Sequence, residues 1–139
     1  MKLLAAIVIA LSCTATFADD AADVKAMTAT WTPEKFEVEG ADMTATFKDI
    51  KLVIDGVKYT VTINGLTDSG TVKLDSNKTP KAMDVIGTEG VNKGKTYPCI
   101  YELKDGKLTV CYSTDEKVRP TKFETSKDSK TMLAVYSKK

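Results

Sequence analysis

The chain has 139 residues, the length of a single domain, and its 20 basic and 19 acidic residues leave a formal net charge of +1. This balance excludes the strongly basic surface with which proteins bind nucleic acids or anionic membranes. The sequence contains no histidine, the most frequent general base and metal ligand, and shows no catalytic constellation or metal-binding pattern. We therefore expect neither an enzyme nor a cofactor.

The start of the chain has the features of a secretory signal peptide, which we place at residues 1–18. Lys2 precedes an uninterrupted apolar run, and the segment ends in the small-residue pattern of a cleavage site at Ala18. The run is too short to cross a bilayer as a helix, which takes about 20 residues. We expect cleavage after Ala18 and secretion or export to the periplasm, with residues 19–139 as the mature domain. The alternative is a lipoprotein acylated at Cys13.

The mature domain begins with a short helical segment. The alanines and early acidic residues of residues 19–30 predict a helix of about two turns, or a frayed arm. A β region begins near residue 30, and Pro33 indicates an edge position or a bulge in its first strand.

The clearest hairpin follows. Asp55-Gly56 is a two-residue turn signal, because a type I′ turn needs positive φ at both central positions. This turn predicts Ile54 opposite Val57 and Leu52 opposite Tyr59. Apolar residues alternate with lysine and threonine along both strands, so we expect one face in the core and one in water.

Further short alternating segments complete the chain, at residues 69–76, 81–87, 99–103, 108–112, 119–125 and 131–137. Eight or nine short strands separated by frequent turn signals indicate a sandwich or a barrel. Consecutive hairpins favour an up-and-down order, and closure of the sheet would remove its exposed edges. We predict an all-β antiparallel up-and-down barrel of eight to nine strands with a short N-terminal helix.

The hairpin at residues 99–112 has a register that can be predicted from its apolar residues. Both apolar faces must look at the same core, so Leu103 must lie opposite Leu108 and Tyr101 opposite Val110. Any odd shift of this register would turn one apolar face to water.

The same register separates two cysteines. Cys99 then lies opposite Tyr112, and the side chains of Cys99 and Cys111 point to opposite sides of the sheet, too far apart for a disulfide. The alternative is a one-residue slip through a bulge at Gly106, which would place the two cysteines opposite each other. An oxidising compartment would favour that bond. We expect free thiols, and no catalytic role for them.

An ordered set of short motifs follows the first hairpin, namely Pro80-Lys81, Met83-Asp84-Val85, Gly94-Lys95-Thr96, Ile100-Tyr101-Glu102-Leu103, Cys111-Tyr112 and Arg119-Pro120-Thr121-x-Phe123. In these motifs the chain resembles a family of small secreted domains from planctomycete-type bacteria, which has a lipocalin-like barrel and no established activity. Two positions depart from the family pattern: Ala29 replaces the usual glycine of Gly-x-Trp, and Cys99 stands where glycine is usual. The resemblance implies a lipocalin-like (calycin-like) fold and an analogy to carriers of small apolar molecules.

The resemblance also suggests a structural contact between the single tryptophan and the single arginine. In lipocalin-like barrels a tryptophan at the base is often covered by an arginine from a late strand, so we expect a cation–π contact between Trp31 and Arg119. The alternative is a core tryptophan and a solvated loop arginine.

A barrel of this size either holds one small ligand or is filled by its own side chains. The candidate lining consists of Tyr59, Val61, Met83, Tyr101, Val110 and Tyr112. The acidic residues Asp42, Asp49 and Asp68 are expected in loops. The leading hypothesis is a secreted, non-enzymatic barrel that binds a small hydrophobic or amphipathic molecule. The alternative is a filled barrel that acts as an extracellular structural or protein-interaction module, whose protein partner the sequence does not identify.

Overall fold

The computed structural model describes residues 20–139, and the predicted signal peptide, its cleavage site and Cys13 lie outside this part. The helices are α1 (Asp20–Met27) and α2 (Thr44–Phe47). The strands are β1 (Ala29–Val38), β2 (Ala41–Asp42), β3 (Lys51–Asp55), β4 (Lys58–Ile63), β5 (Leu66–Asp75), β6 (Ala82–Glu89), β7 (Thr96–Lys104), β8 (Lys107–Ser113) and β9 (Thr131–Lys138).

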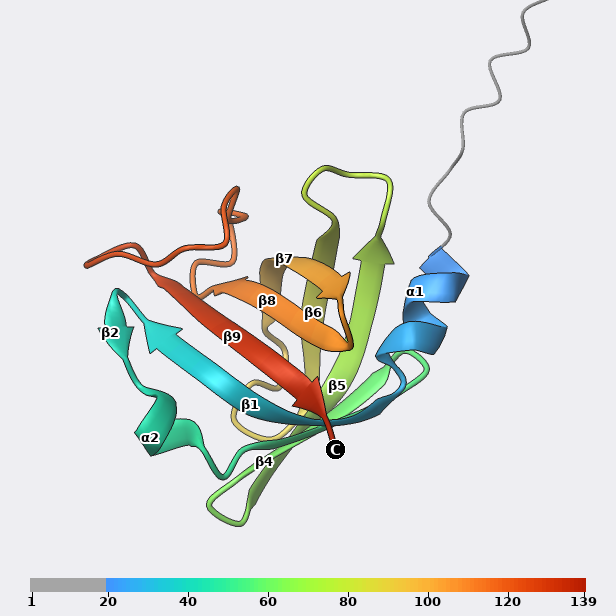
Figure 1. Cartoon of the computed structure of the whole chain (residues 1–139), viewed down its shortest axis with the longest axis horizontal. Coiled ribbons are helices and arrows are strands. Elements are labelled where there is room, and N and C mark those ends of the chain that lie inside the picture. The colour runs from blue at the N-terminus through green and yellow to red at the C-terminus, as the bar shows by residue number, and fades with distance from the viewer. Residues whose placement is uncertain (1–19) are drawn as a thin grey trace, which may run out of the picture.

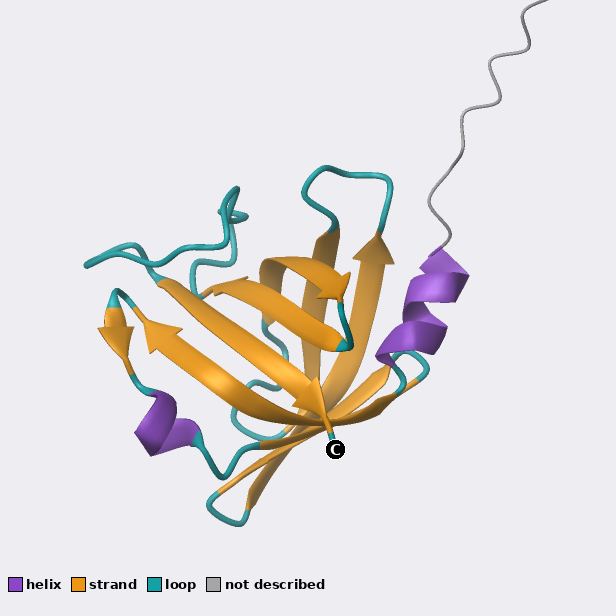
Figure 2. Cartoon of the chain, in the orientation of Figure 1, coloured by secondary structure: helices purple, strands orange, loops and turns teal. Residues whose placement is uncertain are grey.

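The strands form one closed antiparallel barrel (Figures 1 and 2). From β3 to β9 each strand pairs with the next one along the chain, and β1 closes the barrel by pairing with both β3 and β9. The two-residue strand β2 is an addition at the end of β1. This is the predicted up-and-down topology, and closure leaves the eight long strands with a partner on each side.

The N-terminal elements agree with the sequence. Helix α1 has the predicted length of about two turns. The pairing of β1 with β9 shifts between Pro33 and Lys35, which confirms the predicted bulge. Proline has no backbone N–H to donate to the neighbouring strand, so the irregularity falls next to a missing donor.

The predicted register of the β3–β4 hairpin is wrong by two residues. Ile54 pairs with Tyr59, and Leu52 pairs with Val61. The turn is centred on Gly56 and Val57 because glycine takes the positive φ, +61°, at the first central position, as in a type II′ turn. Val57 is consequently 49% exposed. Because the shift is even, all the remaining side chains of the hairpin keep their predicted faces.

The strand predicted at residues 119–125 is absent from the described structure. Strand β8 pairs directly with β9, and the intervening residues 114–130 form a long connection. Phe123 packs from this connection onto Ile100, Cys111 and Leu133. An apolar residue in this segment therefore reflects packing on an existing sheet rather than a strand of its own.

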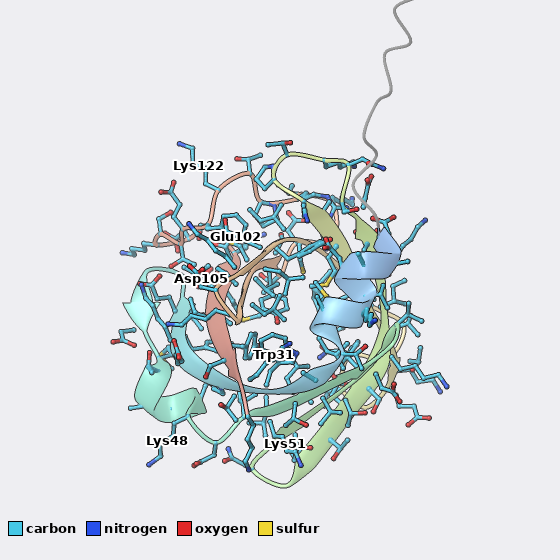
Figure 3. The ribbon with its side chains drawn as sticks, turned by 45° about the vertical axis from the view of Figure 1, so that its right-hand side comes forward. Trp31, Lys48, Lys51, Glu102, Asp105 and Lys122 are labelled. Atoms are coloured by element: carbon cyan, nitrogen blue, oxygen red, sulfur yellow. The ribbon has the colours of Figure 1, made fainter. Side chains whose placement is uncertain are left out.

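The barrel interior is a continuous core that includes the single tryptophan, Trp31 (Figure 3). Charged residues such as Lys48, Lys51 and Lys122 lie at the periphery of the same view. The antiparallel order places α1 and the β3–β4, β5–β6 and β7–β8 connections at one end of the barrel. The β4–β5, β6–β7 and β8–β9 connections lie at the other end, which we call the distal end.

Candidate ligand cavity

Helix α1 lies at one end of the barrel, where hydrogen bonds to the carboxylate of Asp23 attach it. The hydroxyl of Tyr101 donates a hydrogen bond of 2.6 Å to Asp23 Oδ2, and Lys81 Nζ donates one of 2.9 Å to the same oxygen. Burial and the Asp23 carboxylate both raise the pKa of Tyr101, so its hydroxyl remains a donor. Tyr101 therefore attaches the helix to β7.

Two further contacts attach the ends of α1. The indole Nε1 of Trp31 donates a hydrogen bond of 2.8 Å to the carbonyl oxygen of Met27, the last helical residue. At the other end, Asp20 accepts hydrogen bonds from the backbone N–H and the hydroxyl of Ser76. These hydrogen bonds lower the pKa of Asp20. The helix is thus connected to β1, β7 and the β5–β6 connection.

A cavity of about 210 Å³ occupies the barrel interior and extends toward the distal end. Five of the six predicted lining residues border it: Tyr59, Val61, Met83, Val110 and Tyr112. The sixth, Tyr101, does not, because its side chain lies in the contact with α1 and is only 1% exposed. The β3–β4 pairing also places Leu52 and Ile54 in the wall.

The cavity wall contains one polar cluster. Asn92 Nδ2 donates a hydrogen bond of 2.5 Å to Asp68 Oδ2, and the hydroxyl of Tyr97 donates one of 2.8 Å to Asn92 Oδ1. Asp68 is only 8% exposed, and its Oδ1 is buried with no hydrogen-bond partner among the described residues. All three residues line the cavity.

The expectation of a loop position is correct for Asp49 but wrong for Asp42, which ends the short strand β2, and for Asp68. Asp68 belongs to β5, opposite Val61 of β4, and shares the inner face with Gly70 and Val72. The signal was present, since the period-2 alternation of Val72 and Leu74 places Asp68 inward if it is extended backward. An aspartate next to Ser69-Gly70 instead suggested a turn.

Tyrosine hydroxyls add neutral polar groups to the wall. Burial, together with the nearby Asp68, raises the pKa of Tyr59 to about 12. Burial also raises the pKa of Tyr136 to about 12 and that of Tyr112 well above its usual value, and their hydroxyl oxygens lie 3.1 Å apart. The tyrosines are therefore uncharged near neutral pH.

The predicted contact between Trp31 and Arg119 is wrong. Arg119 lies across β6 and β7, where it donates to the carbonyl oxygens of Met83 and Cys99 at 3.1 and 2.8 Å and pairs with Asp84 at 2.6 Å. The connection that carries Arg119 packs outside the barrel, whereas Trp31 is inside it.

A lysine takes the expected place of the arginine over the indole. Lys138 Nζ lies 5.5 Å from the centre of the Trp31 ring. The two residues pair directly across β1 and β9, so the register brings the cation to the ring. The cation over Trp31 is therefore Lys138 and not Arg119.

The two cysteines are free and occupy different sides of the sheet. The predicted register is confirmed, with Cys99 opposite Tyr112 and Ile100 opposite Cys111. Cys99 lies in the inner core, whereas Cys111 packs on the outer face beneath Phe123. Burial raises the pKa of both thiols.

Fold and site together define a closed eight-stranded up-and-down β-barrel with an internal cavity. Comparisons with protein-family models, with curated proteins and with solved structures returned no match. Within residues 20–139, neither helix is long and apolar enough to cross a bilayer. In the same residues, no three cysteine, aspartate or glutamate side chains lie close enough together to hold a metal ion.

Proposed function

We propose that this chain is an exported, non-enzymatic, lipocalin-like barrel that binds a small hydrophobic or amphipathic molecule in its interior. The observation that carries the proposal is the cavity of about 210 Å³, whose wall is mostly apolar and contains a few polar groups. Binding sites for small molecules have this composition. The volume is below the usual range of about 300–1,000 Å³ for such sites, which favours a compact ligand.

Export and family membership are parts of the same proposal. The pattern of residues 1–18 supports cleavage after Ala18 rather than acylation at Cys13. The motif resemblance supports placement among the lipocalin-like domains of planctomycete-type bacteria. Edman sequencing of protein from its natural source tests the cleavage, with Asp19 as the expected first residue.

Ligand binding is tested with 1-aminonaphthalene, a small apolar dye that is neutral at pH 7. We expect the wild-type chain to bind it with a blue-shifted emission. Val61→Phe places a ring in the cavity and should abolish binding. Thr60→Phe, on the opposite face of the same strand, should leave binding unchanged. Equal binding by all three proteins would locate the dye on the outer surface, and absence of binding to the wild type would contradict the proposal.

The alternative, a structural or protein-interaction module, is favoured by a different observation. Leu66, Val91 and Val118 are 75%, 80% and 58% exposed, and each lies in or next to a connection at the distal end. Exposed apolar side chains of this kind mark contact surfaces when they gather in one patch. A barrel that fails to bind the dye but self-associates or captures a partner through these residues would support the alternative.

A further inference from the structure

The cavity has one charged residue in its wall, within the part of the chain that the structure describes. Asp68 is that residue, and the remainder of the lining is apolar or carries neutral hydroxyl and amide groups. Each ion pair found in the described residues uses other acids, so no lysine or arginine neutralises Asp68. A buried carboxylate is costly unless a cation or several donors compensate it.

The hydrogen bonds of Asp68 are incomplete. Its Oδ2 accepts one bond of 2.5 Å from Asn92, while its buried Oδ1 has no partner among the described residues. A carboxylate can accept about four hydrogen bonds. Asn92 is itself held by the hydroxyl of Tyr97. The cluster is thus rigid, yet it leaves acceptor capacity unused.

The connection between β6 and β7 is packed closely against this carboxyl group. A Cβ atom on Gly90 would lie 2.5 Å from Asp68 Oδ1, and one on Gly87 would lie 2.0 Å from the carbonyl oxygen of Asn92. Glycine at both positions allows this approach. The cluster is therefore part of a fitted structure and not an accidental loop contact.

We propose that the ligand of this cavity is amphipathic with a cationic amine head, which docks at Asp68 and Asn92 while its apolar part fills the barrel. This inference rests on the proposed function and specifies its ligand class. An ammonium group supplies the positive counter-charge that the Asp68 carboxylate lacks. The lining offers no cation to an acidic ligand such as a fatty acid, and the neutral tyrosines leave Asp68 as its single charge.

Three ligands with the same phenylethyl tail test the head group: 2-phenylethylamine, 2-phenylethanol and 3-phenylpropionate. Isothermal titration calorimetry at pH 7 and low salt should give a Kd for the amine at least about tenfold below that for the alcohol, because a charge-assisted hydrogen bond is added. The acid should bind more weakly than the alcohol, since its carboxylate faces Asp68 without a counter-charge.

Asp68→Asn removes the charge and keeps the shape of the side chain. We expect the amine to lose at least about tenfold in affinity, with little change for the alcohol. Glu102→Gln, on the outer face of β7, makes the same change in net charge away from the cavity and should leave both affinities unchanged. Binding of 2-phenylethanol by Asp68→Asn shows that the variant is folded. The comparison of the three ligands on the wild-type protein tests the head group without any variant.

The outcomes separate the two proposals. Equal affinity for amine and alcohol, tighter binding of the acid, or an amine preference that persists in Asp68→Asn would overturn the amine proposal while leaving cavity binding in place. Failure of all three ligands and of 1-aminonaphthalene would overturn both. A tenfold amine preference that disappears only in Asp68→Asn supports both.

Discussion

Tyr101 brings a hydroxyl group into the apolar interior, and Asp23 of helix α1 accepts its hydrogen bond at 2.6 Å. The tyrosine thus belongs to the attachment of the helix and not to the cavity wall. The alternation of inward and outward side chains correctly assigned Tyr101 to the interior. That alternation does not determine which neighbouring element covers an interior residue. The covering helix becomes known only from the tertiary structure.

Removal of this hydroxyl should destabilise the barrel. Tyr101→Phe leaves the half-buried Asp23 with Lys81 as a remaining partner, so we expect a loss of about 1–3 kcal/mol in the free energy of unfolding, measured with urea. Tyr59→Phe is the matched control, since no hydrogen-bond partner of the Tyr59 hydroxyl is found in the described structure, and it should cost less. Equal effects of the two substitutions would contradict the assigned role.

The thiols should be unreactive in the folded protein. Burial raises the pKa of Cys99 and Cys111, and both side chains are inaccessible, so neither thiolate forms appreciably near pH 8. We expect no labelling by Ellman's reagent until the chain is unfolded, and then two thiols in the chain cleaved after Ala18. A mature chain without titratable thiols after denaturation would reveal a disulfide and contradict the register.

Helix α1 is the element whose attachment responds to pH. Its first residue, Asp20, has a lowered pKa because Ser76 donates hydrogen bonds to the carboxylate. A carboxyl group with a lowered pKa in the folded state stabilises that state above its unfolded pKa of about 3.9, and the contribution disappears as pH falls through the folded value.

The comparison of wild type with Ser76→Ala tests this attachment. The variant lacks the hydroxyl donor, so it should be less stable near neutral pH, and the difference should shrink below about pH 4. Unfolding is followed by the fluorescence of Trp31, whose indole bonds to the last residue of α1. A difference that stays constant down to pH 2 would show that the Asp20 carboxylate is not involved.

The β6–β7 connection should depend on a glycine. A Cβ on Gly87 would lie 2.0 Å from the backbone oxygen of Asn92, so Gly87→Ala must displace the connection, at about 1–3 kcal/mol. Gly56→Ala is the control, because its Cβ meets no atom within 4 Å and only its positive φ costs about 1 kcal/mol. NMR shifts of Asn92 and Tyr97 should change only in Gly87→Ala, and unchanged shifts there would contradict the packing.

At the scale of the whole molecule, the period-2 pattern determined most of the fold. It predicted the register of the β7–β8 hairpin, because a one-residue slip would expose several apolar side chains. The consecutive hairpins predicted the up-and-down order, and Pro33 itself predicted the bulge in β1. The register of the β3–β4 hairpin was missed because Gly56 can be the second central residue of a type I′ turn or the first of a type II′ turn. The two registers differ by two residues, so both keep the apolar side chains on the same face of the sheet.

The site was less predictable than the barrel. Five lining residues follow from the alternation of inward and outward side chains. Asp68 was assigned to a loop because the residues after it, Ser69 and Gly70, are typical of turns. Its hydrogen-bond partner Asn92 comes from a separate connection, between β6 and β7. The partner of Arg119 could not be derived, because the path of residues 114–130 over the outside of the barrel has no periodic signal. Long-range contacts made by irregular segments are the part that local pattern does not encode.

The measurement that tests the account most directly is a two-dimensional ¹H–¹⁵N NMR titration of the mature chain with 2-phenylethanol. The account predicts saturable shift changes in the cavity wall, at Val61, Met83 and Tyr97 for example, and none at Leu133 or Phe123 on the outer face. Shift changes confined to the outer face, or none at all, would show that the barrel does not admit a ligand.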